Sequence, residues 1–265
     1  MNSTLFGKEF RANLPVTGII AAVLAMYVVC VVAMYDPELN KSLDAMMASM
    51  PELFAAFGMA TQTTSLVDFL INYLYGLLLT VMPFVLILLM VNKLIVRYVD
   101  RGTMAYLLAT PNSRVRIATT MAGVLLAALA VLLAVTVLVE IGSSEAMFPG
   151  DLDGEALARV NAGLFALWLF LGGMCFLSAC LFSNAGRALW VGGGLGVLFF
   201  LMQMMAQLGE DLEFLDAANP LTLYDAYGLA SADASATGGA IALAVAGLAL
   251  FAAAIAVFSR RDLSV

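Results

Sequence analysis

The chain has 265 residues, of which 63% are hydrophobic and 12% are charged, and its formal net charge is −7. Soluble domains average about 45–50% apolar and about 25% charged residues, and a soluble chain of this length has too little interior to bury so much apolar surface. The composition therefore excludes an ordinary soluble domain. It predicts an all-α integral membrane protein, because the apolar runs are continuous rather than alternating, as transmembrane helices require.

Residue usage also argues against chemistry on this chain. Histidine is absent, which removes the commonest general base and the commonest metal ligand. The three cysteines, Cys30, Cys175 and Cys180, lie inside apolar runs and are interpreted as packing residues. The sequence contains neither a Gly-x4-Gly-Lys-Ser/Thr phosphate loop nor a Gly-x-Ser-x-Gly nucleophile motif. We therefore expect no catalytic, metal or cofactor site on this chain.

Six apolar stretches are long enough to cross a bilayer, which takes about 20 helical residues. An amphipathic segment precedes the first stretch, and we expect it to form an N-terminal helix that carries Phe6, Lys8, Phe10 and Arg11. All six spans are assigned to one transmembrane domain, residues 1–265. In chain order the predicted spans cover residues 16–35, 66–91, 117–141, 161–182, 188–208 and 238–258.

The distribution of Lys and Arg predicts the orientation. In a six-span arrangement ten of the twelve basic residues fall on one side of the membrane, and only Lys41 and Arg159 fall on the other. Basic residues are retained in the cytoplasm, so we predict that both termini are cytoplasmic. The acidic residues gather in the opposite loops, which are interpreted either as solvated surface or as a negative outer face that attracts a cationic cargo.

The second predicted span holds two candidate pathway residues, Asn72 and Pro83. Pro83 is expected to kink the helix, whereas Asn72 either lines a pathway or bonds to a neighbouring helix. Asp68 and Glu140 are interpreted as helix-end residues that reach the membrane surface, with a relay as the alternative. An ion-driven carrier normally needs a buried carboxylate or a broken helix at mid-depth, and neither is evident in the sequence. The energy for any transport is therefore expected to come from elsewhere.

Small residues predict close helix packing in the later spans. Gly192 and Gly196 form a Gly-x3-Gly pair in the fifth span, and Gly172 and Gly173 lie in the fourth. Such residues let two helices approach closely, either within one chain or between subunits.

The connection between the second and third spans predicts a short cytoplasmic helix. Thr103 suits its N-cap, and the helix stops before Pro111 because the residue before proline disfavours the α conformation. Met104, Leu107 and Leu108 would be exposed on this helix. They suit either a groove on a partner protein or insertion into the lipid headgroups.

This connection resembles a known family. Gly102-Thr103, followed by Leu107-Leu108-Ala109-Thr110-Pro111-Asn112-Ser113-Arg114, is similar to the "GT…LL(S/A)TP(V/I)SR" signature of ABC-2 type transporter permeases. The first outer loop (residues 50–58) and the ending Phe258-Ser259-Arg260-Arg261-Asp262-Leu263 resemble the same family. The chain departs from it at Asp100-Arg101, where the family usually has a pair of acidic residues.

The resemblance implies a function and partners. It implies the permease subunit of an ATP-driven exporter in a bacterial or archaeal cell membrane, paired with a second permease copy or homologue. Two separate ATPase subunits would hold the ATP and Mg²⁺, and the short helix would be the coupling helix that docks on them. The residues expected to contact the ATPase are Asp100, Gly102, Thr103, Met104, Leu107, Leu108, Pro111 and Arg114.

The resemblance further implies re-entrant outer helices between the fifth and sixth spans, with Asn219 and Pro220 in a gate. Two alternatives remain open at this point. One is a membrane scaffold, sensor or immunity subunit that transports nothing, and the other is an ion-coupled secondary transporter. The substrate is not indicated by the residues.

Overall fold

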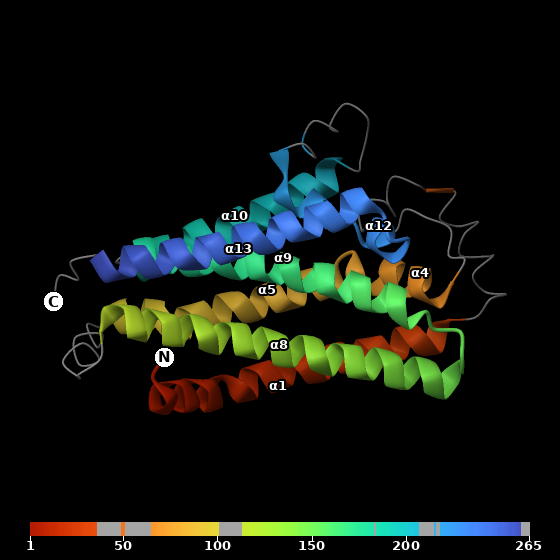
Figure 1. Ribbon diagram of the computed structural model, residues 1–265, viewed down its shortest axis with the longest axis horizontal. Coiled ribbons are helices and arrows are strands. Elements are labelled where there is room, and N and C mark those ends of the chain that lie inside the picture. Colours follow the sequence, from red (N-terminus) through yellow and green to blue (C-terminus); the bar gives the residue numbers. More distant parts are fainter. Residues whose placement is uncertain are drawn as a thin grey trace.

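The computed structural model describes residues 1–35, 49–50, 65–100, 113–182, 184–206, 215 and 218–260. All regular structure in this part of the chain is helical. Long helices run side by side along the length of the molecule (Figure 1). They are α1 (Ser3–Met34), α5 (Leu78–Val91) with its continuations η2 (Asn92–Val96) and α6 (Arg97–Asp100), α8 (Arg114–Met147), α9 (Gly154–Leu181), α10 (Ala185–Ala206) and α13 (Ala234–Arg260).

Six of these segments are long and apolar enough to cross a bilayer, with Leu78–Val96 as the second. The predicted number of apolar helices is therefore confirmed, and it indicates a multi-pass membrane protein. Helix α9 is the centre of the bundle, since most of its length is buried against α5, α8, α10 and α13. The N-terminus and the end of α13 lie at the same end of the bundle (Figure 1).

The N-terminal amphipathic segment and the first span form one continuous helix, α1. The Asn2 side chain caps it by accepting hydrogen bonds from the Thr4 and Leu5 amides at 3.0 and 3.2 Å. Lys8 and Arg11 are exposed, as an amphipathic helix requires. The buried face of α1 is expected to be apolar, but three of its buried side chains are polar: Glu9, Asn13 and Thr17.

The second predicted span is interrupted. It begins at α4 (Leu66–Leu70), where Ser65 and Asp68 form a reciprocal capping box, so Asp68 is a helix-end residue as predicted. It continues as a π-helical turn, η1 (Ile71–Tyr75), and breaks at Gly76–Leu77 before α5 begins. The interruption thus precedes Pro83, and α5 runs through that proline.

A tryptophan from α9 explains why helix α5 can contain Pro83. Proline has no N–H, so the carbonyl of Leu79, four residues earlier, lacks its helical partner. The indole Nε1–H of Trp168 donates to this carbonyl at 2.8 Å, and Trp168 is fully buried. The missing backbone hydrogen bond of α5 is therefore replaced by a side chain of α9.

Glycines set the spacing of α9 from its neighbours. A Cβ at Gly173 would lie 2.7 Å from the carbonyl oxygen of Gly247 in α13, and a Cβ at Gly247 would lie 2.6 Å from the backbone of Leu169. In α10, Gly192 packs on Cys175 and Ser178 of α9, and Gly196 packs on the ring of Phe84. The Gly-x3-Gly pair thus serves packing within this chain.

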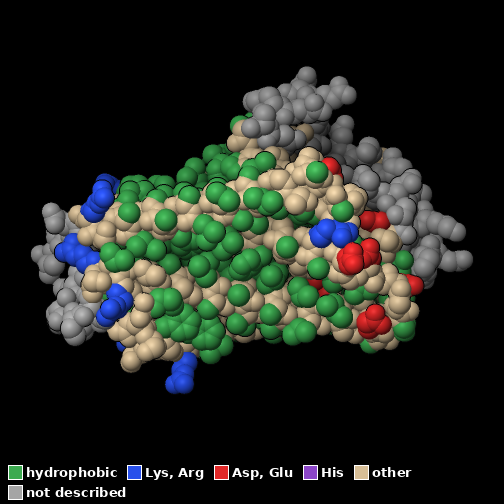
Figure 2. Space-filling model, viewed as in Figure 1, with side chains coloured by type: hydrophobic (Ala, Val, Ile, Leu, Met, Phe, Trp, Pro, Cys, Tyr) green, Lys and Arg blue, Asp and Glu red, His purple; other side chains and the backbone are tan. Residues whose placement is uncertain are grey.

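The two ends of the bundle carry opposite charge. Figure 2 shows Lys and Arg gathered at one end and nearly all Asp and Glu at the other. We call them the basic end, which holds the N-terminus of α1, and the acidic end, which holds the α8–α9 connection. Every described Lys and Arg except Arg159 belongs to an element terminus at the basic end.

The described residues between α10 and α13 include two short helices, η4 (Pro220–Leu223) and α12 (Ala226–Ala230). Arg159 of α9 lies at the acidic end because it binds α12. Its Nε and Nη2 donate to the carbonyls of Leu229 and Ala230 at 3.0 and 2.8 Å. These carbonyls end α12, where a cation is favourable. Arg159 therefore holds α12 against α9.

Trp168→Phe is expected to lower the free energy of unfolding by about 1–3 kcal/mol, because the Leu79 carbonyl would be left unpaired in an apolar core. Pro83→Ala restores a backbone N–H to that carbonyl, so Trp168→Phe should cost less when Pro83→Ala is present. The double-mutant cycle is measured by reversible unfolding in detergent micelles. Trp190→Phe is the matched control, since Trp190 is 80% exposed on α10. An equal cost of Trp168→Phe with and without Pro83→Ala would contradict the assignment.

Candidate functional site

A carboxylate is buried among apolar helices in the half of the bundle nearer the acidic end. Glu140 of α8 is 0% exposed and lies seven residues before the end of that helix, about 10 Å along its axis. The Tyr75 hydroxyl lies 2.9 Å from both carboxylate oxygens, and the Asn161 amide donates to one of them at 3.1 Å. The interpretation of Glu140 as a residue that reaches the membrane surface is therefore wrong.

The cluster joins three helices. Tyr75 comes from η1, Glu140 from α8 and Asn161 from α9. The Asn161 amide also donates to the Tyr75 hydroxyl at 2.6 Å, while its Oδ1 atom is buried without a hydrogen-bond partner in the described part of the chain. A buried polar group is stable only where its partners are in place, so the cluster fixes η1, α8 and α9 relative to one another.

The partners of Glu140 are neutral. Among the described residues no Lys or Arg forms an ion pair with it, and the one ion pair found there joins Arg159 to Glu155 at 3.8 Å. The hydroxyl and amide donors stabilise a carboxylate but do not cancel its charge. Glu140 thus places a negative charge, when ionised, in an apolar region without an opposite charge beside it.

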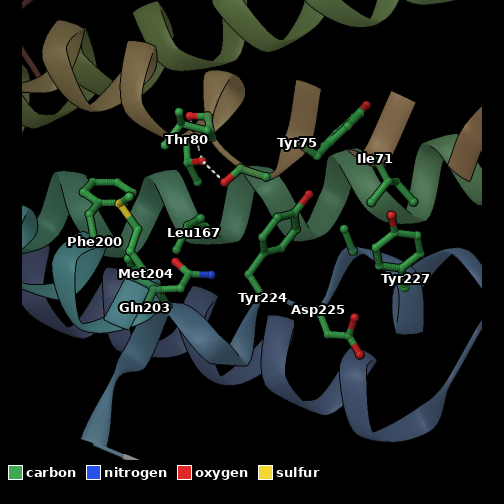
Figure 3. Close-up of a pocket in the computed structure, with 14 residues that line it drawn as sticks. Ile71, Tyr75, Thr80, Leu167, Phe200, Gln203, Met204, Tyr224, Asp225 and Tyr227 are labelled. Carbon is green, nitrogen blue, oxygen red and sulfur yellow. Dashed lines mark hydrogen bonds between the residues drawn. The ribbon is translucent and has the colours of Figure 1, made fainter. Parts of the chain in front are cut away.

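A pocket of about 180 Å³ adjoins the cluster. It lies between the break of the second span, the end of α10 and the η4–α12 segment. Figure 3 shows Thr80, Gln203 and Tyr224 around this space, with the Tyr75 hydroxyl directed away from Gln203 and Met204. The Gln203 side chain makes no hydrogen bond with the described residues, so its amide is free to bind a ligand.

Tyrosines separate the pocket from the buried carboxylate. Tyr224 lines the pocket, and its hydroxyl makes only a long 3.5 Å contact with the carbonyl of Val160. Desolvation raises the pKa of Tyr224 well above its ordinary value, and the negative charges of Glu140 and Asp225 raise it further. The fields of both carboxylates therefore reach the tyrosine that forms one wall of the pocket.

The four candidate pathway residues lie around this region without lining the pocket. Asn72 is buried and accepts a hydrogen bond from Tyr227, so it joins η1 to α12. Asn219 is also buried; it donates to the carbonyl of Phe199 at 3.1 Å and caps η4, of which Pro220 is the first residue. Asn72, Asn219 and Pro220 thus position the pocket's walls, while Pro83 belongs to the contact with Trp168.

The residues expected to contact an ATPase lie mostly outside the described residues. Gly102, Thr103, Met104, Leu107, Leu108 and Pro111 are in the range 101–112, which is not described. Asp100 is the last residue of α6, and Arg114 is the first residue of α8. The chain therefore leaves and re-enters the described structure at the basic end, on both sides of the expected coupling helix.

A second polar contact adjoins that segment. The Tyr98 hydroxyl of α6 donates to Glu9 of α1 at 2.8 Å, and Glu9 is 5% exposed. Burial and this hydrogen bond raise the pKa of Tyr98 to about 12, so the hydroxyl stays protonated and remains a donor at neutral pH. The N-terminal helix is thereby attached to the residues that lead into the expected coupling helix.

Sequence reasoning missed Tyr75, Asn161, Gln203 and Tyr224 as site residues, and it misread Glu140. The sequence could have indicated Asn161 and Glu140 as site residues, because each is a polar residue inside or at the edge of an apolar run. The tyrosines carry no such signal, since aromatic residues are common in membrane helices.

Comparison with known proteins does not assign the chain: no family model, no curated protein and no solved structure matches it. The function is therefore argued from the residues and geometry of the chain itself.

Tyr75→Phe is expected to lower the free energy of unfolding by about 1–3 kcal/mol, because it removes a donor from a buried carboxylate. Glu140→Gln removes the charge that needs this donor, so the two changes together should cost less than the sum of the single changes, with a coupling of about 0.5–3 kcal/mol. Unfolding of the detergent-solubilised variants measures both terms. Tyr27→Phe on the exposed face of α1 is the control. Additive effects of Tyr75→Phe and Glu140→Gln would show that the contact contributes nothing.

Proposed function

We propose that this chain is the membrane-spanning permease subunit of an ATP-driven exporter, and that a separate ATPase supplies the energy. The observation that carries the proposal is the segment between α6 and α8, whose residues 102–114 resemble the coupling-helix signature of ABC-2 type permeases. The described residues that flank it, Asp100 of α6 and Arg114 of α8, lie at the basic end, and this supports the proposal because a coupling helix must face the cytoplasm and Lys and Arg mark the cytoplasmic side. Both termini would then be cytoplasmic.

In this mechanism ATP binding closes the ATPase dimer and displaces residues 101–112. Two attachments carry that displacement into the bundle. Arg114 begins α8 directly after the segment, and the hydrogen bond between Tyr98 and Glu9 joins α6 to α1. The ATPase shifts the permease between two states only if it binds those states with different affinity. The subunit pairs with a second copy or homologue, as the family does.

The pocket at the acidic end is the proposed cargo site of this exporter. The break at Gly76–Leu77 forms part of the pocket's wall, and residues of α12 form another part. Hydrogen bonds to Asn72 and Arg159 hold α12 in place. Rigid α9 packs behind it through Leu167. A break in one wall and short helices in another allow the pocket to open without unpacking the centre of the bundle, and the short helices η4 and α12 are the proposed re-entrant gate.

Substitution of Leu107 and Leu108 by Asp tests the coupling helix. If an ATPase co-purifies with the wild-type chain in mild detergent, the double variant is expected to lose it, because two buried charges disrupt an apolar docking surface. Quantitative mass spectrometry of the purified protein measures the ratio. Met147→Asp is the control, since Met147 is exposed at the opposite end of α8.

Two results would contradict this assignment. Recovery of a stable permease without any ATPase, from its natural membrane, would favour a scaffold, sensor or immunity subunit. Retention of the ATPase by a folded double variant would place the docking surface elsewhere on the chain.

A second candidate function, ion-coupled transport, gains support from two observations. Glu140 is a buried carboxylate in an apolar bundle, and the second predicted span breaks at Gly76–Leu77; these are the two features that such carriers use. Against it, Glu140 is enclosed by fixed donors and is fully shielded from solvent.

Proteoliposomes that contain the permease alone separate the two candidates. With an imposed pH gradient and a fluorescent pH indicator inside, the exporter proposal predicts the same proton leak for the wild-type chain and for Glu140→Gln. A proton flux that needs Glu140 and no ATPase would favour the ion-coupled carrier. Glu145→Gln, an exposed carboxylate five residues further along α8, is the matched control.

A further inference from the structure

The pocket between Tyr75, Gln203 and Tyr224 has a chemical character that identifies a ligand class. Its lining carries apolar and aromatic side chains together with the amide of Gln203 and the hydroxyl of Thr80. The Thr80 hydroxyl already donates to the carbonyls of Gly76 and Leu77 at 3.1 Å. The Gln203 amide, which makes no hydrogen bond with the described residues, can bind a ligand, since an amide oxygen accepts hydrogen bonds while its NH₂ donates them.

The pocket's volume limits the ligand. Pockets that hold drug-sized molecules span roughly 300–1,000 Å³. At about 180 Å³ this pocket is smaller, so it suits a compact molecule rather than a peptide or a lipid.

The charges around the pocket favour a cation. Tyr75 lies between the pocket and Glu140, with its hydroxyl 2.9 Å from the carboxylate, so Glu140, when ionised, places a negative charge behind an aromatic wall. Asp225 lies on the pocket's other side and accepts from the Gly228 amide at 3.0 Å. Neither carboxylate forms an ion pair within the described residues. One buried carboxylate and one exposed carboxylate, neither of them in an ion pair within the described residues, together with two tyrosine rings, attract a positive charge to this site and repel an anion.

The acidic end of the bundle adds a longer-range attraction. Asp and Glu side chains gather there in Figure 2, and the pocket lies in this half of the molecule. Such a field raises the local concentration of cations and lowers that of anions.

We propose that this pocket binds a small organic cation, with the charge balanced by Glu140 and Asp225 and the apolar part held by Tyr75 and Tyr224. The proposal rests on the exporter function above, for which it names the cargo class. A cation there supplies the opposite charge that the neutral hydrogen-bond partners of an ionised Glu140 do not provide.

Equilibrium binding of radiolabelled choline to the purified permease in nanodiscs tests the proposal. Choline carries a compact quaternary ammonium, and 3,3-dimethylbutan-1-ol has nearly the same shape without the charge. Wild-type protein is expected to bind choline saturably, and the neutral analogue is expected to compete at least tenfold more weakly. Glu140→Gln should weaken choline binding by about tenfold or more, whereas Glu145→Gln should leave it unchanged.

A second pair of variants keeps the test independent of the folding of Glu140→Gln. Gln203→Phe fills the pocket from α10 while leaving Tyr75, Glu140 and Asn161 unchanged, and it should abolish choline binding. Met205→Phe places the same ring on the exposed side of α10, where Met205 is 46% exposed, and should bind like wild type.

Three outcomes would overturn the proposal: no saturable choline binding by the wild-type chain, equal competition by the neutral alcohol, or equal binding by Gln203→Phe and Met205→Phe. Each is measured without an ATPase. Failure of the cation site would therefore leave the ATPase co-purification result standing, and loss of the ATPase partner would leave choline binding intact.

Discussion

The buried hydrogen-bonded cluster of Tyr75, Glu140 and Asn161 is the constraint on which the half of the bundle nearer the acidic end depends. An apolar surface alone lets membrane helices slide or rotate against one another, because lipid is as apolar as their side chains. A carboxylate that must keep its donors removes that freedom, since each lost hydrogen bond leaves a polar group unpaired in a medium without water. The cluster fixes η1 against α8 and α9, and this places Tyr75 in the wall of the pocket.

A related arrangement holds the second span, whose geometry is irregular at three places. It has π-helical turns at η1 and η2 and a break at Gly76–Leu77, and Pro83 removes a further backbone donor. Side chains of α9 compensate for this irregularity: Trp168 donates to the carbonyl of Leu79, and Asn161 donates to Tyr75. Helix α9, the most buried span, thus acts as a rigid support for a neighbour whose backbone is already interrupted.

The sequence predicts well what depends on local composition. The six apolar helices, the cap formed by Asp68 and the separation of charge between the two ends follow from hydropathy and residue type within one segment. It does not predict what depends on distant partners. Because Glu140 lies seven residues before the end of α8, the sequence predicts that it reaches the interface. Hydrogen bonds from Tyr75 and Asn161, 65 and 21 residues away, instead keep its carboxylate buried.

In the proposed exporter the basic end meets an ATPase and the acidic end holds the cargo, and the contact with the ATPase is the more fundamental of the two proposals. Cryo-electron microscopy of the complex purified from its natural membrane tests this contact. We expect two ATPase subunits at the basic end, in contact with residues 101–112 of two permease chains. A permease with no ATPase, or with a partner seated at the acidic end, would contradict it.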